Sequence, residues 1–376
     1  MKICFDETGS PDNFLRLAKE LSEDSSVKGL MVFACDSNGW TEVILKPILQ
    51  SFDKPIFGGI FPQIIHGRKN YERGVLVVGL PVAPDIAIVH GLSDPNADYD
   101  QQLEPCVDQW AIGKAEHETL VVLVDGLSKY IAALTQSLFA CFGLERNFIG
   151  GGTGSLSFIQ KPCLLTPHGL IADAAVVVRL QLGLGVGVSH GWQPISAGMR
   201  VTESNGRIIQ SLDWRPAFEI YRELVEAHSG LQFSENNFFD LAKRYPFGIG
   251  KIGAEVVVRD PFMTDENGGI ICVGEVPQNC LVKLLNGTPE SLIAAAARAR
   301  HLAEEAVPTT LTDEQPALFV DCISRVLYLG DQIEEELRVV AGKRLLFGAL
   351  TLGEIANNGK AYLEFYNKTA VLGIFA

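Results

Sequence analysis

The sequence predicts an α/β (α+β) fold of two domains, in which mixed β-sheets carry flanking helices and are built from repeated strand–helix–hairpin units. Continuous apolar runs, such as residues 30–35 and 120–124, are typical of buried strands. They alternate with segments whose apolar residues recur at helical spacing, and glycine-containing turns follow that suit hairpins. The hairpins argue against an all-parallel sheet. A chain of 376 residues has room for two or three domains.

The first two units follow the same order. A helix begins at Pro11, because proline is favoured at the first helical position and apolar residues follow at helical spacing through Leu21. The strand GLMVFAC, the segment PIFGGIFP and the strand GVLVVGL come next. The second unit runs through VVLVD, a helix over 128–142, FIGGGTG, the hairpin PCLLTPHGLI and AAVVVRL. We interpret this recurrence as an internal repeat.

A third unit is predicted at the end of the chain. Its parts are the strand ALFVDC, a helix over 330–340, the segment LLFGALTLGEI, and a final alternating segment that we interpret as a hairpin around Asn367. Patterns of this α/β kind are common, so the sequence leaves open whether this third copy is a true repeat.

Different material lies between the second and third units. A helix follows Pro216 and stops at Gly230. The strands AEVVVRD and GIICVGEV are joined by a DENGG turn, which is a strong hairpin signal. An alanine-rich helix begins after Thr288, a preferred capping residue, and ends at Ala306.

These features suggest where the domains begin and end. We assign residues 1–26 to an N-terminal helix region, 27–218 to a first domain and 219–376 to a second domain. Residues 308–316, PTTLTDEQP, form the clearest linker-like stretch.

Composition and charge exclude several classes of protein. With 31 basic and 45 acidic residues the net charge is −14, which disfavours bulk binding to nucleic acid or to an anionic membrane. The most apolar stretch, 170–188, contains charged residues and is interpreted as two buried strands, so we expect no membrane insertion. The eight cysteines form no CxxC pair, which favours reduced, buried thiols. We expect a soluble, cytoplasmic protein.

The familiar catalytic and nucleotide-binding motifs are missing. The glycine clusters GGGTG and GLGVGVSHG do not have GxGxxG spacing, and no GxxxxGK[ST] occurs. HExxH and GxSxG are absent, and the seven histidines are not spaced as metal ligands. Spacing alone therefore identifies no catalytic constellation.

Several other residues are candidates for a ligand site, each with a structural alternative. His190 and Trp192 in VSHGWQPI could contact a ligand or cofactor, or form a turn held by a backbone hydrogen bond. Arg259 at the expected end of the strand AEVVVR could clamp a carboxylate, or pair with a neighbouring acid. Cys322 and Arg325 follow a strand, where the thiol could contact ligand or fill core.

Glu354 and two glycine clusters complete this set. Glu354 follows a glycine in LGEIANNGK and could accept a ligand amine, or pair with an arginine. Gly58 and Gly59, and the run Gly150, Gly151 and Gly152, allow the close approach of a ligand or of another backbone.

Taken together, these motifs resemble the FIST-domain proteins, named for F-box and intracellular signal transduction. The segments GLMVFAC, IFGGI, GVLVVGL, IGGGTG, VSHGWQPI, VTESNGRII and LDWRPAFEIY resemble the N-terminal domain of the family. The segments YPFGI, VVVRD, GGIICVGEV, CISR, FGALTLGEI and FYNKT resemble its C-terminal domain. One departure is the apolar continuation of the first glycine turn, Ile-Phe-Pro-Gln. A second is that we expect no attached transducer domain, so output would need a separate partner.

The resemblance implies a sensory module that binds a small molecule, such as an amino acid, and acts with a signalling partner, such as a kinase. The ligand-facing candidates that it implies are His190, Trp192, Arg259, Cys322, Arg325 and Glu354, with the two glycine clusters. Some members resemble haem-binding nitric-oxide sensors that regulate a histidine kinase. For that alternative, His190 is the first candidate for axial ligand and His168 the second.

Two further functional hypotheses remain open. The chain could be an enzyme with Cys322 as nucleophile and His190 or Glu354 as base, although no third, orienting group is identifiable. It could also be an adaptor that works through its surface. In the leading hypothesis Arg259, Arg325, Glu354 and Cys322 converge on one cleft, where arginine and glutamate would complement a carboxylate and an amine.

Overall fold

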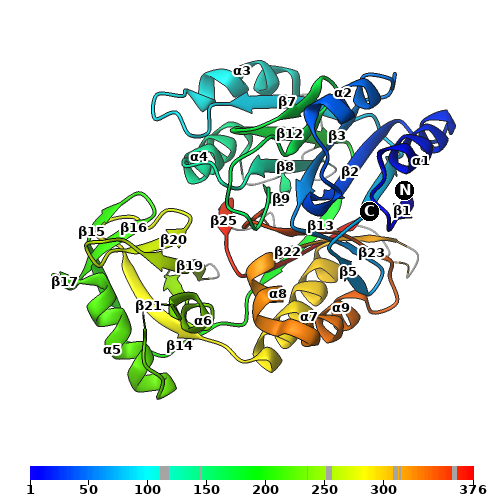
Figure 1. Cartoon of the computed structure of the whole chain (residues 1–376). Helices are drawn as coiled ribbons and strands as arrows, with labels where there is room; N and C mark the ends of the chain where they lie inside the picture. The colour runs from blue at the N-terminus through cyan, green and yellow to red at the C-terminus, as the bar shows by residue number, and fades with distance from the viewer. Residues whose placement is uncertain are drawn as a thin grey trace.

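The chain folds into three topologically equivalent units and one inserted sheet (Figure 1). A computed structural model describes residues 1–110, 118–143, 146–234, 236–250, 256–307, 312, 315–357 and 362–376. Most of the predicted linker at 308–316 lies outside these residues. Each unit has the order strand, helix, strand, helix, strand, hairpin, strand.

The first unit spans the N-terminal part of the chain. Its elements are β1 (Lys2–Asp6), α1 (Pro11–Glu23), β2 (Gly29–Cys35), α2 (Glu42–Leu49), β3 (Ile56–Phe61), β4 (Gln63–His66), β5 (Lys69–Tyr71) and β6 (Val75–Leu80). The helix predicted after Ser10 is confirmed, with proline at its start and Phe14, Leu17, Ala18 and Leu21 all buried.

The second unit repeats the first. Its elements are β7 (Asp85–His90), α3 (Tyr99–Trp110), β8 (Thr119–Asp125), α4 (Ile131–Phe142), β9 (Asn147–Thr153), β10 (Leu164–Thr166), β11 (Gly169–Ile171) and β12 (Ala174–Leu180). The helix α4 begins three residues later than predicted.

The third unit is divided by an insertion. Its elements are β13 (Leu184–Ser189), α7 (Pro289–Ala306), β22 (Ala317–Cys322), α8 (Ile323–Leu329), α9 (Ile333–Ala341), β23 (Leu346–Thr351), β24 (Glu354–Asn357), β25 (Glu364–Tyr366) and β26 (Ala370–Phe375). The third repeat, which the sequence left open, is therefore present in the topology. The predicted helix over 330–340 corresponds to α9, and α8 was not predicted.

The insertion between β13 and α7 forms a separate antiparallel sheet, which lies to one side of the core in Figure 1. Its elements are β14 (Gln193–Pro194), β15 (Met199–Asn205), β16 (Ile208–Leu212), β17 (Arg215–Pro216), α5 (Ala217–Ser229), α6 (Phe238–Ala242), β18 (Phe247–Ile249), β19 (Val257–Thr264), β20 (Ile270–Val273) and β21 (Leu281–Asn286). The predicted hairpin of β19 and β20 is confirmed.

Each unit lends its hairpin to the sheet of another unit. The first hairpin, β4–β5, pairs with β23; the second, β10–β11, pairs with β3; and the third, β24–β25, pairs with β9. The three six-stranded sheets therefore interlock. Pairings such as β13 with β26 and β4 with β23 cross the predicted boundary at 218, and that boundary stays a prediction.

Two local expectations were wrong. The last segment is not a hairpin around Asn367, because β25 pairs with β24 while β26 pairs with β22 and β13. Arg259 does not end its strand, because β19 continues past Pro261 to Thr264 with a register irregularity at the proline. A bulge is a common way for a strand to accommodate proline, which has no N–H to donate.

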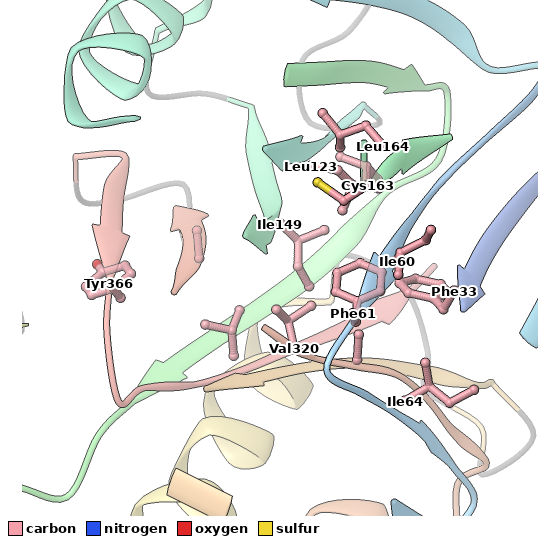
Figure 2. Close-up of a cluster of buried hydrophobic side chains, with 14 of the residues drawn as sticks. Phe33, Ile60, Phe61, Ile64, Leu123, Ile149, Cys163, Leu164, Val320 and Tyr366 are labelled. Atoms are coloured by element: carbon pink, nitrogen blue, oxygen red, sulfur yellow. The ribbon is translucent and has the colours of Figure 1, made fainter. Parts of the chain in front are cut away.

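The inner faces of the three units meet in one apolar core (Figure 2). Phe33 and Phe61 of the first unit pack with ring centroids 5.6 Å apart, and Ile149 of the second unit and Val320 of the third lie in the same cluster. The labelled side chains in Figure 2 come from all three units, so no unit buries its apolar face alone.

One glycine in each unit occupies an equivalent, crowded position. Gly58 pairs with Val32, Gly150 with Val122, and Gly348 with Phe319, each across the parallel strands of its unit. A Cβ atom on these glycines would lie 2.1, 1.8 and 1.9 Å from the partner's carbonyl oxygen. Any side chain there would force the two strands apart.

We predict that Gly150→Ala destabilises the fold by about 3 kcal/mol, near the upper end of typical overpacking costs, because backbone must move to admit the methyl group. The midpoint of urea unfolding, followed by circular dichroism, measures the effect. Gly198→Ala is the matched control, since a Cβ there meets no atom within 4 Å. Equal midpoints for the two variants would contradict this account of the core.

Candidate functional site

A cavity of about 350 Å³ lies between the three-unit core and the inserted sheet. We call it the interface cavity. The core contributes residues from the turns after β8, β9, β22 and β23, and the inserted sheet contributes residues from β19, β20 and α6. Its lining is mostly apolar, and its volume falls in the range of small-molecule sites.

Two aromatic rings connect the two sides of the cavity. Phe158 of the core stacks on Phe262 of the inserted sheet, with centroids 6.0 Å apart and planes 4° apart. The guanidinium group of Arg207 lies over the ring of Phe262, 6.0 Å from the ring centroid. Phe158 has a φ of 54°, a strained value for a bulky residue. Strain of this kind is often found at binding sites.

The main polar contact across the cavity wall is a buried ion pair. Asp260 of β19 lies 3.2 Å from the ammonium group of Lys368 and accepts a hydrogen bond of 2.6 Å from Ser324. Both charged side chains are buried. Burial raises the pKa of Asp260, while Lys368 and Ser324 oppose the shift.

Lys368 joins three parts of the molecule. Its ammonium group donates to the Lys243 carbonyl at 2.9 Å, which lies next to α6 in the inserted segment. The same group lies 5.2 Å from the Trp192 ring centroid, and the indole N–H donates to the Lys368 carbonyl at 3.1 Å. Trp192 belongs to the connector that leaves the core after β13. Lys368 therefore holds together the ion pair with Asp260 and the connector at Trp192.

The returning connector is fixed beside the first. Tyr328 of α8 donates to the carbonyl of Gly287 at 2.6 Å, and its ring centroid lies 5.5 Å from that of Trp192. A Cβ on Gly287 would approach the Trp192 ring to 2.9 Å. The exit and the return of the inserted chain thus pack against each other.

Cys322 lines the interface cavity at the end of β22, with a buried carboxyl behind it. Glu354 receives hydrogen bonds from the Thr351 hydroxyl at 3.1 Å, from the Thr369 backbone N–H at 3.2 Å, and from Cys322. Burial raises the pKa of Glu354 to about 8. Burial, Glu354 and Asp260 raise the pKa of Cys322, so the thiol stays neutral.

Glu354 departs from the pattern of the other units. It pairs with Gly151 at the register where Leu164 pairs with Gly59 and Ile64 pairs with Ala349. An apolar side chain therefore occupies this core position twice and a carboxyl occupies it once. Comparison of the three units therefore shows that the third has a carboxyl group at a position that is apolar in the other two.

Arg325 lies in a separate buried network. It forms ion pairs with Asp321 and Glu336, and it donates to the carbonyls of His190 and Leu292 at 2.9 and 3.1 Å. These contacts join α8 to α7 and to the end of β13. Arg325 does not line the interface cavity.

His190 lies with Arg325 and not in the cavity. Its Nδ1 accepts a hydrogen bond of 2.9 Å from the backbone N–H of Trp192. Burial, with the charges of Arg325 and Arg298, lowers the pKa of His190 to about 4. The ring is therefore neutral and helps to fix the turn that begins the exit connector.

Arg259 lies directly behind the cavity wall. Its guanidinium donates to the carbonyls of Glu275, Val258 and Phe365 at 2.7, 3.0 and 2.9 Å. Glu275 and Phe365 line the cavity, and Arg259 itself does not. It holds the inserted sheet to β25 of the core.

The predicted glycine clusters are occupied by protein. A Cβ on Gly59 would meet the Thr153 side chain at 2.4 Å, and one on Gly151 would meet the Gly353 carbonyl at 2.6 Å. At Gly152 it would meet the Leu352 carbonyl at 2.3 Å. With Gly58 and Gly150 above, all five positions serve close packing between strands.

Of the four residues expected to share a cleft, only Cys322 lines the interface cavity. Arg259 and Glu354 lie in the layer behind it, and Arg325 belongs to the separate network. Sequence reasoning missed Asp260, Lys368 and the cavity residue Asn367, of which the last two follow Tyr366 in the motif FYNKT. The ligand-binding roles predicted for Arg259, Cys322, Arg325 and Glu354 remain predictions.

All eight cysteines are free. No group of three histidine, cysteine, aspartate or glutamate side chains suited to a metal occurs among the described residues. Within the same residues, no helix has the length and apolar character needed to cross a membrane.

We predict that Lys368→Met destabilises the protein by about 3–5 kcal/mol, because it leaves Asp260 buried without its counter-charge. Chemical unfolding measures the loss. Lys368→Met combined with Asp260→Asn removes the uncompensated charge while keeping the Ser324 hydrogen bond, and should recover much of the stability. No recovery in the double variant would show that the ion pair is not the cause.

A second prediction concerns pH. The pKa of Glu354 is about 8 in the folded chain, above its ordinary value of 4.5, so the folded state retains a proton that the unfolded state loses. This stabilisation is complete below pH 4.5 and is lost as the pH rises through 8. Relative to Glu354→Gln, the wild type should lose on the order of 4 kcal/mol between pH 4.5 and 9.

Unfolding at a series of pH values tests this difference. Glu334→Gln, a change at an exposed site, should run parallel to the wild type. A constant gap between wild type and Glu354→Gln across this range would mean that Glu354 does not titrate as described.

Comparison with known families identifies the chain. The FIST N domain matches residues 29–215, and the FIST C domain matches residues 217–357. No curated protein matches the sequence. FIST domains are associated with sensory signal transduction and small-ligand binding and are not a known enzyme family. The two matches cover most of the chain and confirm the predicted resemblance, so this chain belongs to the FIST family.

Proposed function

We propose that this protein is a cytoplasmic sensor that binds a small molecule in the interface cavity and reports occupancy to a separate signalling partner, such as a kinase. The position of the cavity is the observation that carries the proposal. It is lined by residues matched to the FIST N domain, such as Phe158, and by residues matched to the FIST C domain, such as Phe262 and Cys322.

A ligand in this place contacts two bodies at once. The core is interlocked by its three sheets, whereas the inserted sheet joins the core through the two connectors around Trp192 and Gly287. A ligand changes a conformational balance only if it binds one arrangement better than another. A molecule that contacts the stacked rings of Phe158 and Phe262 meets this requirement, because moving the inserted sheet changes its contacts.

The location, the partner and the ligand class of the proposed sensor are supported by other observations. A cytoplasmic location fits the eight free cysteines. A transducer partner is supported by the association of the family with signalling, and we propose that it is a separate protein. An amino acid is one candidate ligand, as the family resemblance implies.

Catalysis by Cys322 is not part of this proposal. The thiolate is the nucleophile in cysteine chemistry, and a thiol between the carboxyl groups of Glu354 and Asp260 resists ionisation. His190 is held by Trp192 outside the cavity, so it is not placed to act as the base.

Haem is also left out, because the residues present do not fit it. The described lining of the cavity contains no histidine, methionine or tyrosine, and the thiol of Cys322 is neutral. His190 uses Nδ1 for the Trp192 N–H, and the second candidate, His168, is exposed in the turn between β10 and β11. The absorption spectrum of the purified protein tests haem binding directly.

We predict that filling the cavity abolishes ligand stabilisation without unfolding the protein. Ala132 of α4 lines the cavity, whereas Ala140 lies on the same helix and is exposed away from it. A panel of the twenty amino acids and their primary amides, with thermal unfolding as the readout, identifies a stabilising compound. At 100 times its dissociation constant, a ligand stabilises by about 2.7 kcal/mol.

Ala132→Phe should remove this shift, and Ala140→Phe should keep it. An unchanged shift in Ala132→Phe would place the binding site elsewhere. If no compound in the panel raises the melting temperature, other small molecules that have an apolar body are tested with the same pair of variants.

A further inference from the structure

Asn367 stands apart from the other polar residues of the interface cavity. It is fully buried and lines the cavity, and neither its Nδ2 nor its Oδ1 has a hydrogen-bond partner among the described residues. Roughly nine in ten or more of the buried backbone polar groups in proteins, and the large majority of buried side-chain polar atoms, are hydrogen-bonded. An amide with both ends unpaired at a cavity wall is therefore suited to bind a ligand through its donor and its acceptor together.

Glu275 provides a third unpaired atom. It also lines the cavity, and its Oε1 is buried with no partner in the part of the chain that the structure describes. Burial raises the pKa of Glu275, and the nearby charge of Arg259 opposes that shift. The wall thus offers two acceptor oxygens, one on Glu275 and one on Asn367, and one NH₂ donor on Asn367.

The remaining charges near this wall already have partners. Asp260 is paired with Lys368 and Ser324, and Arg259 donates to three carbonyls. The two described cations that do line the cavity, Lys129 and Arg207, are exposed. A ligand with a lone buried carboxylate would find no buried cation free among the residues that the structure describes, and burying an unpaired charge is costly.

We infer that the ligand carries an N–H donor and an oxygen acceptor side by side, as a primary carboxamide or an α-amino carboxylate does, on an apolar body. Its oxygen accepts from Nδ2 of Asn367, and its N–H groups donate to Oδ1 of Asn367 and Oε1 of Glu275. The apolar body contacts the stacked rings of Phe158 and Phe262. This inference rests on the proposed function and names the ligand class of the same cavity.

The chemistry of Asn367 makes the test specific. Replacing a buried, unpaired polar group by an apolar group of similar shape is neutral or stabilising for the free protein. If Asn367 only supported the fold, its replacement would instead lower the stability of the free protein. Asn367→Leu should therefore leave the melting temperature of the free protein unchanged or raised, while weakening binding about tenfold to a hundredfold.

Calorimetric titration with four compounds that share one phenylalkyl body separates the head groups. These are phenylalanine, 3-phenylpropanamide, phenethylamine and 3-phenylpropanoate. The first two should bind wild-type protein at least about tenfold more tightly than the last two, since each of the latter leaves a wall group unpaired.

Glu275→Gln distinguishes the two favoured head groups. Its side chain keeps an acceptor oxygen but loses the charge, so it should retain the binding of 3-phenylpropanamide and weaken that of phenylalanine. If the amine or the propanoate binds as tightly as the amide, or if Asn367→Leu binds all compounds as the wild type does, the inference is wrong.

The same titrations separate the two levels of the proposal. Binding that disappears in Ala132→Phe but is unaffected by Asn367→Leu keeps the sensor function and overturns the ligand class. Binding that survives in Ala132→Phe overturns the site itself.

Discussion

The close contact between a glycine and the neighbouring parallel strand is the constraint on which the rest of the fold depends. At Gly58, Gly150 and Gly348 the lack of a side chain lets the strand pack directly against a backbone carbonyl of the neighbouring strand. On their other side, the same glycines pair with Leu165, Ile355 and Ile65, which lie on hairpins of other units.

Each sheet is consequently completed by another unit. The swapped hairpins bring apolar side chains from all three units to one cluster, so the burial that stabilises one sheet requires the other two (Figure 2). The core is thus a closed assembly within one chain. The inserted sheet, attached through two connectors, is the part that lies outside this interlocking arrangement (Figure 1).

The sequence predicted local elements well because their signals are local. The faces of α1 and α4, the capped start of α7 and the hairpin of β19 and β20 all follow from periodicity, proline and turn residues. The exchange of hairpins was not predictable in this way, because periodicity does not identify the partner of a strand. The hairpin predicted around Asn367 is wrong for this reason. Its first strand, β25, pairs with β24, which begins at Glu354, and not with the strand that follows Asn367.

The site was predicted only in part for a related reason. Cys322 was identified from its place at a strand end, which is a common position for ligand contacts. Lys368 is stable in the interior only because Asp260 and Trp192, distant in sequence, surround its ammonium group. Nothing in the local sequence indicates that a lysine between Asn367 and Thr369 is buried.

The unusual chemistry of the third unit coincides with the place where the insertion meets the core. Glu354 replaces the leucine and isoleucine of the other units, and Asn367 leaves its amide unpaired at the cavity. Lys368, one residue further, contacts both the exit connector at Trp192 and the inserted sheet at Asp260. A molecule bound at Asn367 is therefore one residue from Lys368, which connects the core to the inserted sheet. The proposed sensor needs no long chain of coupled residues, because the proposed binding wall and the contact between the core and the inserted sheet are formed by the same short segment.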